Sequence, residues 1–187
     1  MKVLGIAGSL RRASYNRALV EAARTLAPAG MVIEVFDLDD IPLYNADLDV
    51  DGVRPPEVER LKQAIAAADA LLVATPEYNY GVSGVLKNAI DWASRPAMKS
   101  VLAGKPVAIM GASTSTTGTA RAQQELKLVL MGCLSLVMPH AGVLVGMARE
   151  KFSESGALTH EPTRRFLASF LHDLQTWVYR LGAVRTT

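Results

Sequence analysis

Residues 75–92 read Thr-Pro-Glu-Tyr-Asn-Tyr-Gly-Val-Ser-Gly-Val-Leu-Lys-Asn-Ala-Ile-Asp-Trp, and the fold can be worked out from this stretch. The five residues before it, Ala-Leu-Leu-Val-Ala at 70–74, form a continuous apolar run that predicts a buried strand. Beyond the loop, apolar residues recur with helical spacing, at Val82, Val85, Leu86, Ala89, Ile90 and Ala93. The stretch therefore joins a strand to an amphipathic helix. In an α/β sheet such a loop lies at the carboxyl end of a strand, where ligands bind.

The first part of this loop has an unusual composition for a simple connection. Pro76 fixes the backbone at the end of the strand, and Tyr78 and Tyr80 place aromatic rings where a plain turn carries small polar residues. Glu77 and Asn79 alternate with the tyrosines. Backbone groups beside aromatic surface suit a planar, hydrogen-bonding ligand, so residues 76–79 are predicted to bind one. The alternative is that the tyrosines cover the core and Glu77 is solvated.

The whole chain has the composition of one globular domain. It has 187 residues, 50% of them hydrophobic, which is enough for a sizeable core, and we expect a single domain over residues 1–187. A net charge of +2 gives no field that requires a nucleic acid partner. The longest apolar tract, 128–138, is far shorter than the ~20 residues of a membrane span, so no membrane role is expected. The apolar run at the amino terminus is too short for a secretion signal, which favours a cytoplasmic protein.

Cysteine and histidine do not point to a metal or redox centre. The single cysteine, Cys133, lies among apolar residues and is predicted to be a small core residue. His140, His160 and His172 are scattered and lack metal-ligand spacing. We therefore expect no metal.

Outward from the central stretch, predicted strands alternate with predicted helices. The strands are expected at 2–7, 31–36, 70–74, 107–110 and 134–138, and the other helices at 16–26, 57–68, 118–131 and 162–181. The alternation predicts an α/β fold with a parallel sheet and right-handed crossovers. Two segments, 41–56 and 143–159, are expected to be irregular; the first is either a lid or partner contact, or a tolerated insertion. The last helix is expected to bury Phe166 and Trp177.

The loop after the first strand has the composition of a phosphate site. Residues 8–16 carry hydroxyls and guanidinium groups and lead into a helix, whose free N–H groups and dipole favour a dianion. Arg11 can add a charge-assisted contact, and Ser9, Ser14 and Asn16 can supply neutral donors. The alternative is that Ser14 is an ordinary helix cap and the arginines are surface charges. The chain has neither a P-loop nor a G-x-G-x-x-G motif, so the loop is predicted to hold a phosphate monoester.

A third loop, 111–119, follows the predicted strand 107–110 and is rich in serine and threonine. Small hydroxyl residues such as Ser113 let the backbone approach a ligand and supply donors without bulk. The alternative is a flexible loop that ends in a threonine cap. Because loops after parallel strands emerge at one edge of the sheet, all three are predicted to share one ligand, with a phosphate at one end and a flat ring at the other.

The motif residues resemble a known family. Pro76-Glu77-Tyr78-Asn79, then Gly84 and Leu-Lys-Asn-Ala-Ile-Asp-Trp at 86–92, are similar to the signature of the NADPH-dependent FMN reductases, which include quinone, azo and chromate reductases. The resemblance implies a flavodoxin-like three-layer sandwich, with a five-stranded parallel sheet in the order 2-1-3-4-5 and helices on both faces. It also implies that the 8–16 loop grips the phosphate of FMN. The third loop matches less closely, because family members commonly carry another glycine near Ser115 or Thr116.

The expected function follows from this ligand. FMN accepts a hydride from NADPH or NADH and passes two electrons to a quinone, free flavin, azo compound or metal oxyanion in a ping-pong cycle, so no catalytic protein side chain is expected. The resemblance also implies a homodimer or homotetramer. The remaining alternatives are a flavodoxin-type electron carrier and a non-enzymatic FMN-binding redox sensor. The choice between NADPH and NADH stays open, as does the physiological acceptor.

Overall fold

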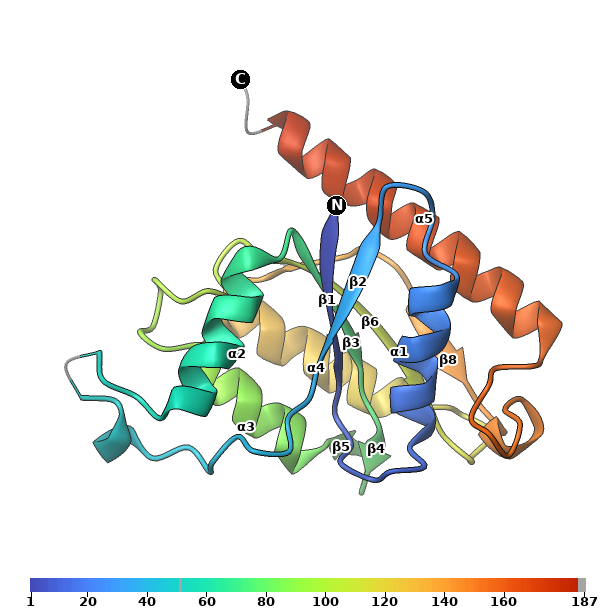
Figure 1. The fold of residues 1–187 in the computed structure, drawn as a ribbon, viewed down its shortest axis with the longest axis horizontal. Helices are drawn as coiled ribbons and strands as arrows, with labels where there is room; N and C mark the ends of the chain where they lie inside the picture. Colours follow the sequence, from blue (N-terminus) through green and yellow to red (C-terminus); the bar gives the residue numbers. More distant parts are fainter. Residues whose placement is uncertain (51, 185–187) are drawn as a thin grey trace.

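The computed structural model describes residues 1–50 and 52–184 of the chain. It has a parallel central sheet between helices (Figure 1). Four parallel strands lie side by side in the order β2-β1-β3-β6. Two further short strands, β7 and β8, both pair with β6 on its outer side, β7 near its start and β8 near its end. The strands are β1 (Lys2–Ala7), β2 (Val32–Phe36), β3 (Ala70–Ala74), β6 (Pro106–Ala112), β7 (Leu136–Val137) and β8 (Val143–Val145).

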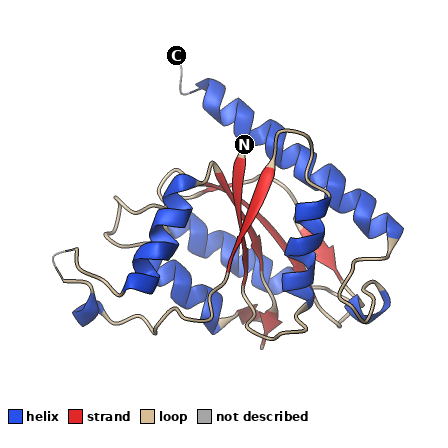
Figure 2. Ribbon diagram, in the orientation of Figure 1, coloured by secondary structure: helices blue, strands red, loops and turns tan. Residues whose placement is uncertain are grey.

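Helices cover both faces of the sheet, as Figures 1 and 2 show. α1 (Tyr15–Thr25) and α5 (Glu161–Val184) lie on one face. α2 (Pro56–Ala67), α3 (Gly84–Ala93) and α4 (Ala120–Gly132) lie on the other. Short 3₁₀ helices occupy Ala46–Leu48 and Ala148–Glu150. The predicted order 2-1-3-4-5 is therefore confirmed in kind, with the fifth position divided between two strands.

The central strand shows why its sequence is continuously apolar. Ala70, Leu72 and Ala74 of β3 belong to the core under α1 and α5, while Leu71 and Val73 belong to the core under α2, α3 and α4. All five residues are buried. A strand that is covered on both faces reads as an apolar run instead of an alternating pattern.

Four sequence predictions need correction. The expected strand 134–138 is reduced to Leu136–Val137, and the segment 143–159, expected to be irregular, contains β8 and a 3₁₀ helix. Strands of two or three residues are too short to show periodicity. The central loop also contains a small hairpin, β4 (Glu77–Tyr78) and β5 (Gly81–Val82), that was not expected. Phe166, expected to be buried, is 49% exposed, because it lies at the margin of the apolar stripe of α5, beside the ring of His140.

The second half of the signature holds the 41–56 connection in place. The side-chain N–H groups of Asn88 and Trp92, both on α3, donate to the carbonyl of Pro42 at 2.8 Å. The Asn88 amide oxygen accepts from the backbone N–H of Tyr44 at 2.7 Å, and the Tyr44 ring packs edge-on against Trp92. These two signature residues therefore have a scaffold role.

Candidate functional site

The loops after β1, β3 and β6 meet at one edge of the sheet, the lower edge in Figure 1. Backbone hydrogen bonds at 2.9 Å join them, from Gly8 to Ala74 and from Thr75 to Met110. They enclose a cavity of about 200 Å³. Eight of the nine predicted binding residues line it, and Asn79 does not. The eight are Ser9, Arg11, Ser14, Asn16, Pro76, Glu77, Tyr78 and Ser113.

Ser14 immediately precedes α1 and has the helix-capping role of the alternative prediction. Its buried hydroxyl oxygen accepts from the backbone N–H groups of Asn16 and Arg17, at 3.2 and 3.4 Å. A hydroxyl that accepts can still donate its proton, and the start of a helix keeps a partial positive charge. Capping and anion binding are thus compatible at this position.

Arg11 supplies a positive charge beside this helix end. Its side chain is exposed, and its guanidinium carbon lies 5.6 Å from the centroid of the Tyr15 ring. Within the described ranges, no carboxylate forms an ion pair with Arg11. The guanidinium therefore remains available for a bidentate contact with a phosphate.

Asn16 ties the first loop to the third. Its amide N–H donates to the carbonyl of Ala112 at 3.0 Å, and its amide oxygen accepts from the Ala112 backbone N–H at 2.9 Å. The residue is only 4% exposed. One of its two amide protons is therefore used by the scaffold, and its predicted contact with a phosphate stays a prediction.

The hairpin after β3 presents its tyrosines to solvent. Asn79 and Tyr80 have φ angles of 50° and 73°, the left-handed pair of a tight two-residue hairpin turn. Tyr78 is 53% and Tyr80 71% exposed, so the alternative in which they cover the core is wrong. The Tyr78 hydroxyl lies 3.2 Å from the hydroxyl of Ser9, which links the hairpin to the first loop.

Glu77 acts as an anionic cap for α4. One carboxylate oxygen accepts from the backbone N–H groups of Arg121 and Ala122, at 3.0 and 3.2 Å, and the other from the Arg121 guanidinium at 2.6 Å. Thr119, at the capping position, makes no such bond itself. Burial opposes ionisation of Glu77, but the hydrogen bonds from Arg121 and Ala122 outweigh it and lower its pKa. The solvated alternative for Glu77 is therefore wrong, since its side chain is 7% exposed.

The third loop takes its shape from the segment around β8. The backbone N–H of Ser113 donates to Val145, and the N–H groups of Met147 and Ala148 donate to Ser115 and Ser113, at 2.9 to 3.0 Å. The Ser113 N–H is thus used internally, while its hydroxyl contacts Ser115. The alternative of a flexible loop that ends in a threonine cap misses this support, because the sequence gives no signal for β8.

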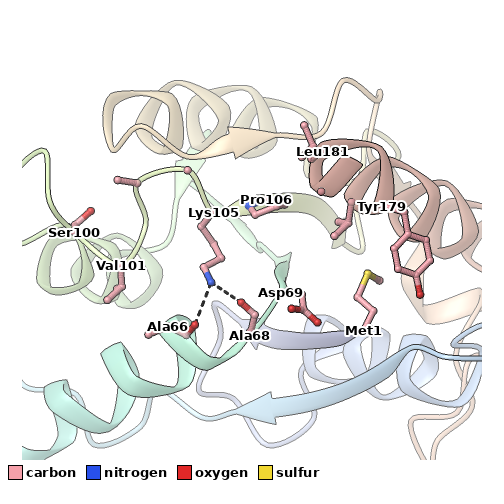
Figure 3. Close-up of a pocket in the computed structure, with 14 residues that line it drawn as sticks. Met1, Ala66, Ala68, Asp69, Ser100, Val101, Lys105, Pro106, Tyr179 and Leu181 are labelled. Atoms are coloured by element: carbon pink, nitrogen blue, oxygen red, sulfur yellow. Dashed lines mark hydrogen bonds between the residues drawn. The ribbon is translucent and has the colours of Figure 1, made fainter. Parts of the chain in front are cut away.

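Larger hollows lie elsewhere. One of about 790 Å³ opens at the amino ends of the strands, where Figure 3 shows Lys105 donating to the carbonyls of Ala66 and Ala68. None of the predicted binding residues lines it. Another, of about 870 Å³, lies between α1 and the turn at 153–157 and borders the site at Arg11, Ser14 and Tyr15. Ligands of open α/β sheets bind at the carboxyl ends of strands, which excludes the first hollow. The second is lined by only two of the predicted residues, Arg11 and Ser14, so the 200 Å³ cavity is the better candidate.

Comparison with known proteins agrees with this geometry. The family model described as NADPH-dependent FMN reductase matches residues 1–150, which include all three loops and α4. The chain belongs to this family. An NAD(P)H-dependent FMN reductase of Pseudomonas aeruginosa is 50% identical over 183 residues, 97% of each chain. A 2-hydroxy-1,4-benzoquinone reductase of a Burkholderia species is 41% identical, over 95% of this chain and 96% of its own.

Solved structures show the same relationship. The flavoenzyme NAD(P)H:(acceptor) oxidoreductase FerB from Paracoccus denitrificans matches with a TM-score of 0.86 at 36% identity, covering 96% of this chain and 97% of that one. The predicted family, the flavodoxin-like α/β class and the expected kind of enzyme, an FMN-dependent NAD(P)H oxidoreductase, are confirmed. No helix in the described part of the FMN reductase chain is long and apolar enough to cross a membrane.

Proposed function

We propose that the chain binds FMN in the 200 Å³ cavity and reduces quinones at the expense of NAD(P)H. The observation that carries the proposal is the convergence of eight predicted residues, from three loops, on this one cavity. The two ends of the cavity differ in chemistry, as do the phosphate and the ring of FMN. We also propose that the chain works as one domain, since both apolar clusters pack on the same sheet.

The end of the cavity at α1 suits the phosphate. Arg11 provides an available charge, the start of α1 adds its partial positive charge, and the Ser14 hydroxyl can donate its proton there. Gly8 allows the loop to sit close to the next one, because a Cβ there would lie 3.0 Å from side-chain atoms of Pro76, Ser83 and Leu86. These residues bind and orient the cofactor and need take no part in the electron transfer.

The hairpin end suits the flavin ring. Pro76 and Tyr78 border the cavity. Because Tyr78 and Tyr80 are exposed, one face of a flavin ring bound here would stay open to a second planar molecule. When bound, FMN supplies hydride acceptance from NAD(P)H and two-electron transfer to an acceptor. Because one face serves both NAD(P)H and the acceptor, they bind in turn, and ping-pong kinetics are expected. A role for the hairpin backbone at Asn79 in contacting the ring belongs to this proposal.

The acceptor we propose is a quinone. Two relatives with this activity in their names, the Burkholderia 2-hydroxy-1,4-benzoquinone reductase and a quinone reductase of Pseudomonas putida, are 41% and 39% identical to the chain. Free flavin is a second candidate, because the Pseudomonas aeruginosa relative, at 50% identity, is named for FMN reduction. A planar acceptor matches an open flavin face in both cases.

A second copy of the chain is the partner we propose, in a homodimer or homotetramer. Leu128 and Met131 on α4 are 71% and 59% exposed, and Leu134 just beyond is 43% exposed. Exposed apolar side chains gathered at the end of one helix suit a protein partner. A cytoplasmic location, where NAD(P)H is regenerated, also belongs to the proposal.

An anaerobic visible spectrum tests the function. The protein is reconstituted with FMN, NADPH or NADH is added, and 1,4-benzoquinone, free FMN, an azo dye or chromate follows. We expect rapid bleaching of the bound flavin and fastest recovery with the quinone. Bound flavin that neither nicotinamide reduces would favour a carrier or sensor instead. Absence of any flavin binding would refute the three-loop site.

A further inference from the structure

The hairpin that borders the proposed ring site is held from outside by α4. The Nε–H of Arg121 donates to Oε1 of Glu77 on β4 at 2.6 Å, and Nη2 forms an ion pair with the same oxygen at 2.6 Å. The same guanidinium lies 4.1 Å from the centroid of the Tyr80 ring at the turn. One helical turn later, the carboxylate of Glu125 accepts from the backbone N–H of Val82 on β5 at 2.7 Å. Both strands and the turn are therefore contacted by the first two turns of one helix.

The hairpin needs such support. Each of its strands has two residues, and an isolated two-stranded hairpin is marginally stable at best. Its turn places Tyr80 at φ 73°, a backbone region that is costly for a bulky residue. Tyr78 and Tyr80 are exposed, so burial of their rings does not fix the turn. Apart from the hydroxyl contact between Ser9 and Tyr78, the side-chain contacts that hold the hairpin are those with α4.

The geometry gives each α4 side chain a separate part. The guanidinium of Arg121 contacts the Glu77 carboxylate through its nitrogens and lies over the Tyr80 ring. Lysine cannot reproduce this combination, because its ammonium group is not planar. Glu125 needs only one acceptor oxygen for Val82. Gly81 lies against this contact, because a Cβ there would be 2.6 Å from the Glu125 carboxylate.

We propose that Arg121 and Glu125 are positioning residues, which clamp the hairpin on α4 and so set the edge of the cavity that receives the flavin ring. The inference rests on the proposed function, because it assigns the ring to the hairpin. It predicts that the clamp affects recognition of the ring and leaves recognition of the phosphate unchanged.

Amide hydrogen exchange of the flavin-free protein tests the clamp itself. Arg121→Ala and Arg121→Lys are expected to speed exchange of residues 77–82 by roughly tenfold, while the core strands β1 and β3 keep their protection. Glu125→Ala should speed exchange at Val82, and Glu125→Gln, which keeps an acceptor oxygen, should restore it. Arg24→Ala, which removes an exposed ion pair on α1, is the matched control. Unchanged exchange in both alanine variants would overturn the proposal.

Binding of FMN and of riboflavin tests the effect on the site. Arg121→Ala is expected to raise the Kd of both flavins by the same factor, roughly tenfold, because they share the ring. Loss of FMN affinity alone would overturn the proposal, since it would place Arg121 at the phosphate, and so would unchanged affinity for both. If the unaltered protein bound neither flavin, the proposed function would fall, and hydrogen exchange alone would decide on the clamp.

Discussion

The first loop and the hairpin border the same cavity but are stabilised in different ways. In the first loop, Ser14 caps its own helix and Asn16 bonds to the backbone of β6, and both side chains are buried. In the hairpin, the turn is exposed and left-handed, and Glu77 depends on Arg121, 44 positions further along the chain. One end of the site is built into the sheet and its first helix, and the other is attached to a helix that comes later.

The difference shows which half of the site can be altered independently. A residue that bonds to a core strand affects binding and folding together, whereas a residue on the hairpin affects local structure first. Four variants test this contrast, and the expected effects decrease from the first to the last.

Asn16→Ala should have the largest effect. It leaves a buried backbone N–H and carbonyl of Ala112 without partners, and we expect the free energy of unfolding to fall by about 3 kcal/mol in urea titrations. Asn16→Asp keeps an acceptor for the Ala112 N–H and lacks the donor, so its free energy of unfolding should lie between those of the unaltered protein and Asn16→Ala. A stability like that of the unaltered protein would show that the first loop is not built into the sheet.

Arg11→Ala should weaken FMN binding by roughly 10- to 100-fold, because a charge-assisted contact with the phosphate is lost. The free energy of unfolding should change by less than about 0.5 kcal/mol, since Arg11 is exposed. Arg12→Ala is the control, because Arg12 is also exposed but does not line the cavity. Fluorescence titration gives the affinity. Equal losses from the two variants would argue against a phosphate contact specific to Arg11.

Glu77→Gln should reduce the change in the free energy of unfolding between about pH 7 and pH 3 by about 1 kcal/mol. The pKa of Glu77 is lowered in the folded chain from its usual 4.5. The stabilisation from the ionised group is therefore fully present above pH 4.5 and is lost as the pH falls through the lower, folded pKa. Urea titrations at several pH values from 7 to 3 should show the two proteins converging at the acid end. A constant difference would exclude an ionised cap.

Ser9→Ala should have the smallest effect. It removes the hydroxyl contact between Ser9 and Tyr78, the side-chain link between the two regions, and we expect a loss of about 0.5 kcal/mol in stability and a two- to threefold rise in the Kd of FMN. Tyr78→Phe removes the same contact from the hairpin side and should match it. A double variant that loses no more than either single one would confirm that the two hydroxyls act as a pair.

Sequence patterns predicted the parts of this molecule that depend on neighbouring residues. The β1 and β3 boundaries at Lys2–Ala7 and Ala70–Ala74 are as predicted, because long apolar runs give a strong signal. The cap at Ser14 is among the predicted alternatives because capping depends on the two or three residues that follow. The binding residues found from motifs lie together because parallel strands end at one edge.

The parts that sequence analysis missed depend on residues far apart in the chain. Arg121 and Glu125 look like ordinary surface charges on a helix until the hairpin is placed beside them. β8 has three residues, and its pairing with β6 fixes the Ser113 loop without any local pattern. Asn88 and Trp92 belong to the signature, yet their contacts are with Pro42.

The divided outer edge of the sheet also bears on solubility during folding. Beside β6, β7 offers two residues and β8 three, so this side has no long free strand on which another chain could assemble. The opposite edge is β2, a run of five residues in which Val32 and Val35 are 63% and 38% exposed. Its one charged side chain, Glu34, is paired with Lys2. If chains aggregate by intermolecular β-pairing, the pairing should therefore begin at β2. Val35→Lys is the substitution that would discourage it.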